Sequence, residues 1–86
     1  MWKTLIYYKP ENIDQANDLR ENYIAHRRGV VDIISETEQD DIEYARENQY
    51  DEAIFIEDCS TVIISDIKSG YTNRLPISDV YYRDTE

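Results

Sequence analysis

Residues 53–67 read AIFIEDCSTVIISDI, and this stretch decides the fold. Residues 53–57 form a near-continuous apolar run, which is typical of a strand buried on both faces of a sheet. The three residues 58–60 are too few for a crossover helix, so residues 61–67 must return as an antiparallel neighbour. The sequence therefore predicts a β-hairpin here.

Two further strands are predicted upstream of the hairpin. Residues 4–9 (TLIYYK) form a short β-rich run that Pro10 closes, because proline cannot donate a hydrogen bond to a sheet ladder. Residues 30–35 (VVDIIS) are β-branched and mostly apolar, as expected for a strand covered on both faces.

A helix is predicted between these two strands. Asn12 and Gln15 have the spacing of a helix N-cap and its partner, and Gly29 can take the left-handed conformation that closes a helix. Apolar residues recur at three- and four-residue steps, which predicts one buried face: Ile13, Ala16, Leu19, Tyr23 and Ile24.

A second, shorter helix is expected before residue 53. Its start could be capped by Ser35 with Glu38 or by Thr37 with Asp40. It is expected to end within residues 48–50, where asparagine tolerates a positive φ angle better than most residues.

The chain closes with a fifth strand at residues 73–77, and Pro76 predicts that this strand lies at an edge. Ser78 is expected to begin a last short helix through Tyr82, and residues 83–86 are expected to fray. Right-handed crossovers place the strands in the order 2-1-3-4-5, with strand 4 antiparallel. The fold class is a three-layer α/β domain with a five-stranded mixed sheet, spanning residues 1–86.

Negative charge is concentrated in the middle of the chain. The net charge is −10, and residues 36–58 contain ten acids against Arg46 alone. Such a stretch repels a phosphate backbone. Three interpretations stay open, in this order: a solvated helix face whose charge maintains solubility, docking to a basic surface of another protein, and last a site for a hard cation. The residues predicted to make protein contacts are Asp40, Asp41, Glu43 and Glu47.

The sequence predicts no catalytic, cofactor or metal site. Ligands of parallel sheets usually sit beyond the carboxyl ends of the strands. Of the residues expected there, Lys9 and Pro10 stand where a magnesium site would need acids, which leaves Asp58 alone. His26 and Cys59 are expected at opposite edges of the sheet, outside hydrogen-bond reach of each other.

Composition excludes several other classes. The two glycines are too far apart for a phosphate-binding loop, and the apolar runs are too short to cross a bilayer. Cys59 is the only cysteine, so no internal disulfide can form, and a reducing, cytoplasmic location is expected.

The chain resembles the C-terminal anticodon-binding-type domain of histidyl-tRNA synthetases and of their paralogue, the ATP phosphoribosyltransferase regulatory subunit of histidine biosynthesis. The resemblance covers about residues 3–78. It rests on the following segments: Leu19-Arg20, Arg28-Gly29-Val30-Val31, Tyr44-Ala45, Ala53-Ile54-Phe55-Ile56, Thr61-Val62-Ile63-Ile64 and Asp66-Ile67-Lys68 before Ser69-Gly70.

The resemblance implies a non-catalytic domain, expected to be a C-terminal fragment of a longer protein. Because a domain of net charge −10 is poorly suited to tRNA, we favour the regulatory subunit, with the catalytic subunit of ATP phosphoribosyltransferase as partner. Two alternatives stay open: the tRNA-binding domain of a histidyl-tRNA synthetase, and a stand-alone acidic interaction domain. Assembly of identical copies also stays open, and no membrane partner is expected.

Overall fold

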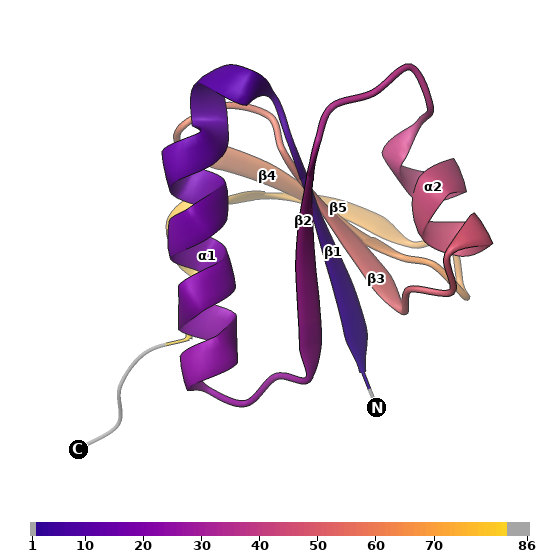
Figure 1. The fold of residues 1–86 in the computed structure, drawn as a ribbon, viewed down its shortest axis with the longest axis horizontal. Helices are drawn as coiled ribbons and strands as arrows, with labels where there is room; N and C mark the ends of the chain where they lie inside the picture. The colour runs from indigo at the N-terminus through magenta and orange to yellow at the C-terminus, as the bar shows by residue number, and fades with distance from the viewer. Residues whose placement is uncertain (1, 83–86) are drawn as a thin grey trace.

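A computed structural model describes residues 2–82. It contains seven main elements, labelled in Figure 1: β1 (Lys3–Tyr8), α1 (Ile13–Ala25), β2 (Val30–Ser35), α2 (Asp41–Glu47), β3 (Glu52–Ile56), β4 (Thr61–Asp66) and β5 (Thr72–Pro76). Short 3₁₀ helices at Pro10–Asn12 and Ile77–Asp79 precede α1 and follow β5. Among these residues, no helix is both long and apolar enough to span a membrane.

The strands form one sheet in the order β2-β1-β3-β4-β5, which confirms the predicted topology. β1 pairs in parallel with β2 and with β3, so that Ile6 lies opposite Ile33 on one side and Ile54 on the other. β4 pairs antiparallel with β3 and with β5. The hairpin after β3 and the edge position of β5 are therefore both as expected.

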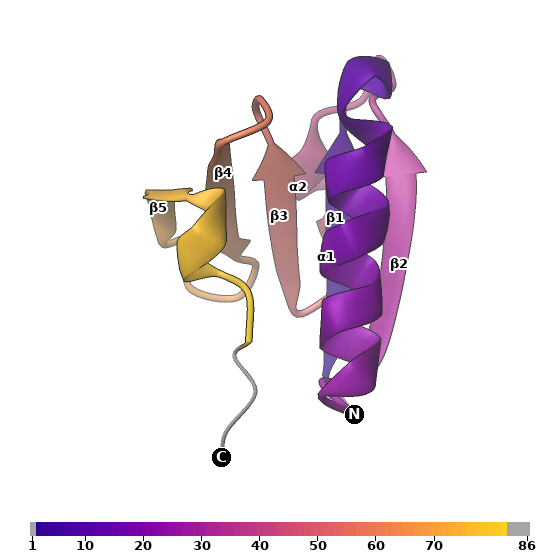
Figure 2. The same cartoon turned by 90° about the vertical axis from the view of Figure 1, so that its left-hand side faces the viewer.

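Helices cover the two faces of the sheet (Figure 1). Figure 2 shows α1 in front of β1 and β2, and the yellow segment after β5 in front of the other end of the sheet. The larger core lies beneath these two segments and consists of Ile6, Tyr8, Ala16, Leu19, Tyr23, Val31, Ile54, Ile56, Val62 and Val80. The smaller core lies beneath α2 and consists of Leu5, Tyr7, Ala45 and Ala53.

The predicted apolar face of α1 is only partly buried. Ala16, Leu19 and Tyr23 are buried, but Ile13 and Ile24 are 44% and 46% exposed. Eleven residues make about three helical turns, so these two isoleucines point the same way, to one side of the buried stripe. The expectation that all five residues face the core was therefore wrong.

The predicted caps of α1 also differ from the structure. The Asn12 side chain makes no capping hydrogen bond, because the preceding 3₁₀ turn gives Asn12 φ −108° and ψ 23° instead of the extended backbone that an N-cap needs. Past the end of the helix, Arg27 has φ 54° and Gly29 has φ 121°, so the left-handed turn begins before the glycine.

The structure settles the open boundaries of α2. Asp40 is the N-cap, and its carboxylate accepts hydrogen bonds from the backbone N–H groups of Ile42 and Glu43 at 3.1 and 3.4 Å. Neither Ser35 nor Thr37 caps the helix. At the other end, Gln49 takes the positive φ angle of 62° that we expected of an asparagine.

β2 is an edge strand, and the expectation that both its faces are covered was wrong. Val31 is buried, Asp32 is exposed, and its other residues are half-buried. The last helix is the 3₁₀ turn Ile77–Asp79, which is shorter than the predicted segment through Tyr82. Residues 83–86, which we expected to fray, lie outside the described part of the chain.

Candidate functional site

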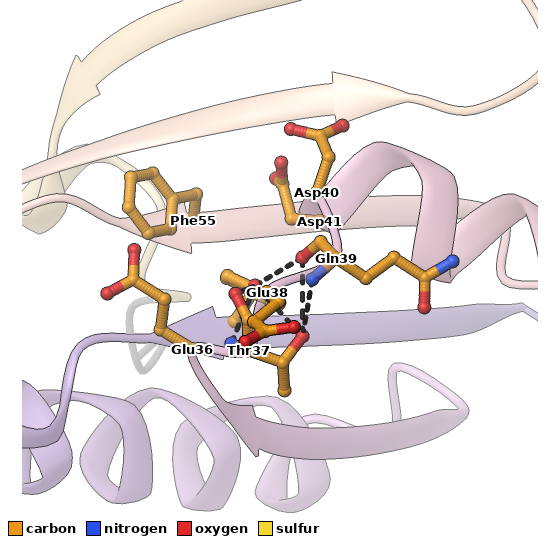
Figure 3. Close-up of a pocket in the computed structure, with 8 residues that line it drawn as sticks. Glu36, Thr37, Glu38, Gln39, Asp40, Asp41 and Phe55 are labelled. Carbon is orange, nitrogen blue, oxygen red and sulfur yellow. Dashed lines mark hydrogen bonds between the residues drawn. The ribbon is translucent and has the colours of Figure 1, made fainter.

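A hollow of about 370 Å³ opens at the carboxyl ends of β1 and β3, beneath the connection from β2 to α2 (Figure 3). This is the edge of a parallel sheet where ligands usually bind. We call it the acidic hollow, and it is lined by Tyr7, Glu36, Thr37, Glu38, Gln39, Asp40, Asp41 and Phe55. Four of these eight residues are acidic and none is basic.

The Tyr7 side chain fixes the wall of the acidic hollow. Its hydroxyl accepts a hydrogen bond from the Thr37 N–H at 2.8 Å and donates one to the Gln39 carbonyl at 2.5 Å. The Thr37 hydroxyl in turn accepts from the Gln39 N–H at 3.1 Å. One buried phenol on β1 thus holds the backbone of an otherwise irregular loop. This loop carries Glu36, Glu38 and Asp40, and the fourth acid, Asp41, begins α2.

The floor of the acidic hollow is aromatic. The rings of Tyr7 and Phe55 lie 5.8 Å apart between centroids, tilted by 57°. The Lys9 ammonium lies 5.9 Å from the centre of the Phe55 ring. Apolar rings beside carboxylates form a surface that suits an organic cation, such as the side chain of lysine or arginine.

The charged form of Asp41 is destabilised within the acidic hollow. Partial burial raises the pKa of Asp41 above its ordinary value, and the neighbouring Asp40 carboxylate raises it further. Hydrogen bonds from backbone N–H groups oppose this rise only in part. A cation placed in the hollow would relieve this repulsion.

The structure separates the four residues predicted to make protein contacts. Asp40 and Asp41 line the acidic hollow, together with Glu36 and Glu38. Glu43 and Glu47 lie farther along α2, where both accept hydrogen bonds from the Gln39 amide nitrogen, at 3.2 and 2.9 Å. The two loop glutamates were not among the predicted contact residues, although the long acidic run already contained them.

The other candidates at this edge form ordinary turn structure. Asp58 accepts hydrogen bonds from the backbone and hydroxyl of Ser60, which lower its pKa. Cys59 is exposed in the same turn, whereas His26 follows the end of α1 at the opposite edge of the sheet, as predicted. Within residues 2–82, no cluster of three His, Cys, Asp or Glu residues could hold a metal ion.

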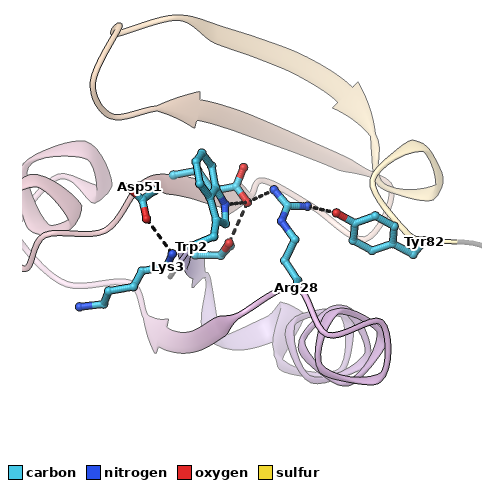
Figure 4. A network of polar contacts seen from close by, with 7 residues as sticks. Trp2, Lys3, Arg28, Asp51 and Tyr82 are labelled. Carbon is cyan, nitrogen blue, oxygen red and sulfur yellow. Dashed lines mark hydrogen bonds and ion pairs between the residues drawn. The ribbon is translucent and has the colours of Figure 1, made fainter.

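A second polar centre, which the sequence analysis missed, lies at the amino ends of the parallel strands (Figure 4). The Glu52 carboxylate is buried and pairs with the Arg28 guanidinium. The same carboxylate accepts hydrogen bonds from the Thr4 hydroxyl at 2.8 Å and from the Trp2 indole N–H at 3.1 Å. The sequence did contain a sign of this centre: Glu52 begins the apolar strand EAIFI, and a buried acid requires a partner.

Aromatic rings surround this ion pair. The Arg28 guanidinium carbon lies 5.0 Å from the ring centre of Tyr23, 5.5 Å from that of Tyr82 and 5.9 Å from that of Trp2. Burial raises the pKa of the Tyr23 hydroxyl, so this phenol stays neutral. Because Glu52 neutralises its charge, Arg28 is not available to bind an anionic ligand. It instead holds Trp2 and Tyr82 together, near the two ends of the described residues.

Comparisons with known proteins bear on the fold. No protein-family model matches the sequence, and no curated protein matches it. Among solved structures, the chain is similar to histidyl-tRNA synthetase from Nostoc sp. PCC 7120, with a TM-score of 0.69 and 12% sequence identity. The match covers 90% of this chain and 20% of the synthetase chain.

The fold is therefore that of an anticodon-binding-like α/β domain, as the resemblance implied. At 12% identity this similarity defines the architecture, and function must be argued from the site.

Proposed function

We propose that this chain is a non-catalytic docking domain whose acidic hollow binds a basic surface of another protein. The observation that carries the proposal is the lining of the hollow, where four carboxylates and two aromatic rings stand at the ligand-binding edge of the sheet without a basic residue among them. Complementary charge gives such a surface both its association rate and its specificity.

More specifically, we propose that the domain belongs to an ATP phosphoribosyltransferase regulatory subunit. The sequence resemblance supports this assignment, and so does the net charge of −10, which a protein-binding paralogue tolerates better than a tRNA-binding one. The proposed partner is the catalytic subunit of that enzyme, and the proposed location is the cytoplasm.

Calorimetric titration with the catalytic subunit tests the proposal. Glu36→Lys combined with Glu38→Lys should weaken binding at least tenfold, because both side chains are exposed in the acidic hollow. Asp40 is unsuitable for this test, since replacing it would also remove the cap of α2. Asp18→Lys combined with Glu21→Lys, on exposed positions of α1, makes the same change in net charge and should leave binding unchanged.

The second candidate function is tRNA binding, which the structural similarity to a histidyl-tRNA synthetase favours. A gel-shift titration with tRNA at low salt separates the two candidates. Submicromolar affinity that falls steeply with salt would reverse our choice. Failure to bind either the catalytic subunit or tRNA would contradict both and favour the stand-alone acidic interaction domain.

A further inference from the structure

The outer edge of β2 carries backbone groups without strand partners. The N–H groups of Val30 and Glu36 donate to carbonyls of β1 and its flank, so the even-numbered residues of β2 face β1. By the alternation of a strand, Val31, Ile33 and Ser35 direct their N–H and C=O groups outward. Among residues 2–82, the Arg20 side chain donates a hydrogen bond to the Val31 carbonyl at 3.3 Å, and Val31 is buried, so this edge is more open at the half-buried Ile33 and Ser35.

One side of α1 lies above the outer edge of β2, in the helical layer next to the sheet. Arg20 places this side of the helix beside β2, and Ile13, Asn17, Arg20 and Ile24 follow one another at steps of four, three and four residues. Residues at these steps share one side of a helix. The two isoleucines are nearly half exposed, and β2 adds the half-buried Ile33 below them.

A hollow of about 370 Å³ runs along the same edge, lined by Leu5, Arg20, Asp32, Ile33, Ile34, Tyr44 and Tyr50. The opposite edge of the sheet differs. β5 contains Pro76 and has mostly polar, exposed residues, which protect an edge against further pairing. β2 is thus the edge that remains open to another strand.

We propose that a second copy of this chain pairs with β2 in antiparallel orientation, about a two-fold axis through Ile33. In this register Ile33 pairs with Ile33 of the second copy, and Val31 pairs with Ser35. All three outward-facing residues then find backbone partners, and the two sheets become one. The Val31 carbonyl can keep its bond to Arg20, because a carbonyl oxygen accepts two hydrogen bonds.

The same two-fold axis places α1 of one copy beside α1 of the other, and the two helices match each other in shape and charge. α1 runs antiparallel to its neighbour in the second copy, which brings Ile13 of one helix level with Ile24 of the other. Glu11 and Asp14 lie at the start of α1 and the exposed Arg27 lies past its end, so the antiparallel arrangement sets acids beside a base. The opposed helix dipoles favour the same arrangement.

The small size of the interface limits the strength of this dimer, whereas the Asp32 carboxylates do not weaken it. The thirteen residues of α1 span about 20 Å, and one short helix and one six-residue strand fall below the roughly 1,200 Å² of total area that stable interfaces bury, so the dimer should be weak and reversible. The two Asp32 carboxylates do not face each other, because each lies opposite Ile34 of the other copy. Each also accepts a hydrogen bond from Tyr50 at 2.7 Å within its own chain.

Salt should affect the dimer and the docking at the acidic hollow in opposite directions. Two copies of net charge −10 repel each other, so screening by salt should strengthen the dimer. The docking proposed for the acidic hollow joins opposite charges and should weaken with salt. The two proposals can therefore fail independently.

Sedimentation velocity on the full chain, from 10 µM to 1 mM protein at about 0.15 M salt, tests the inference. We expect a monomer at the low end and a dimer at the high end. Ile24→Lys should weaken the dimer at least tenfold. Ala25→Lys adds the same charge at the next exposed position of α1 and should leave the dimer intact.

Two further measurements identify the register. Amide exchange at Val31, Ile33 and Ser35 should slow as the protein concentration rises, while amides of β5 should not change. Arg27→Glu should weaken the dimer, and adding Glu11→Arg should restore it. A monomer at 1 mM, a dimer that Ile24→Lys leaves unchanged, or exchange at Ile33 that is independent of concentration would each overturn the inference.

Discussion

Glu52 is a buried carboxylate, and Arg28 is the cation that balances its charge. Arg28→Met keeps most of the side-chain volume but leaves Glu52 with only the neutral donors Thr4 and Trp2. We expect the free energy of unfolding to fall by about 2–3 kcal/mol, because removing one member of a largely buried ion pair leaves the other as an unpaired buried charge. Denaturant titration followed by the fluorescence of Trp2, the only tryptophan, measures this loss.

The matched control neutralises both partners. Arg28→Met combined with Glu52→Gln retains an acceptor for Thr4 and removes the stranded charge. This double variant should therefore be more stable than Arg28→Met alone. A loss below about 0.5 kcal/mol in the single variant would mean that the pair is solvated more strongly than its burial indicates.

Asp41 should make stability depend on pH. Burial and the Asp40 carboxylate raise its pKa in the folded protein above 3.8, so the folded state holds this proton to a higher pH than the unfolded state does. Ionised Asp41 therefore lowers stability at neutral pH, and this loss disappears as the pH falls through the folded pKa toward 3.8.

Asp41→Asn should accordingly raise the thermal midpoint at pH 7, and this gain should vanish below pH 3.8. Paired melting curves of the variant and the parent across this range measure the difference. Asp18→Asn, at an exposed position of α1, serves as the control for lost charge. An equal gain from both variants would assign the effect to net charge instead of to the acidic hollow.

At the scale of elements, the joint between α1 and β2 depends on Gly29. Its φ of 121° is unfavourable for any other residue, and a Cβ there would lie 2.3 Å from the Trp2 carbonyl oxygen. That oxygen accepts the Val30 N–H bond that begins the pairing of β1 with β2. Gly29→Ala should therefore cost about 2–3 kcal/mol of unfolding free energy.

Gly70→Ala is the comparison for this substitution. Gly70 also has a positive φ, 77°, but a Cβ there would meet no atom within 4 Å. It should cost about 1 kcal/mol, from backbone strain alone. Equal losses from the two alanines would show that the contact with Trp2 relaxes at no cost.

The elements differ in how far the sequence predicts them. β2 has the predicted bounds, because its apolar run is bracketed by Gly29 and by polar residues. Exposure was harder to predict, since Ile13 and Ile24 fit the helical period of the buried residues yet lie on the flank of their stripe. Periodicity tells which residues share a side of a helix, but not how wide the neighbouring layer is.

For the whole molecule, the topology was predictable because connection lengths decide it. The four residues between β3 and β4 allow only a hairpin, and helix-length connections before β3 impose right-handed crossovers. The candidate site was predictable only in part. Its acids come from one continuous stretch, whereas the Tyr7 hydroxyl that shapes its wall and the Arg28–Glu52 pair depend on contacts through space.

Trp2 and Tyr82 both pack on the Arg28 guanidinium, so the first and last residues described come together at one corner of the molecule (Figure 4). Because these two residues lie close together, the segment 2–82 could be inserted into a surface loop of a host protein without breaking the five-stranded sheet of the inserted segment. The same closeness would allow circular permutation, in which a short linker joins residues 2 and 82 and new termini are opened in a surface loop.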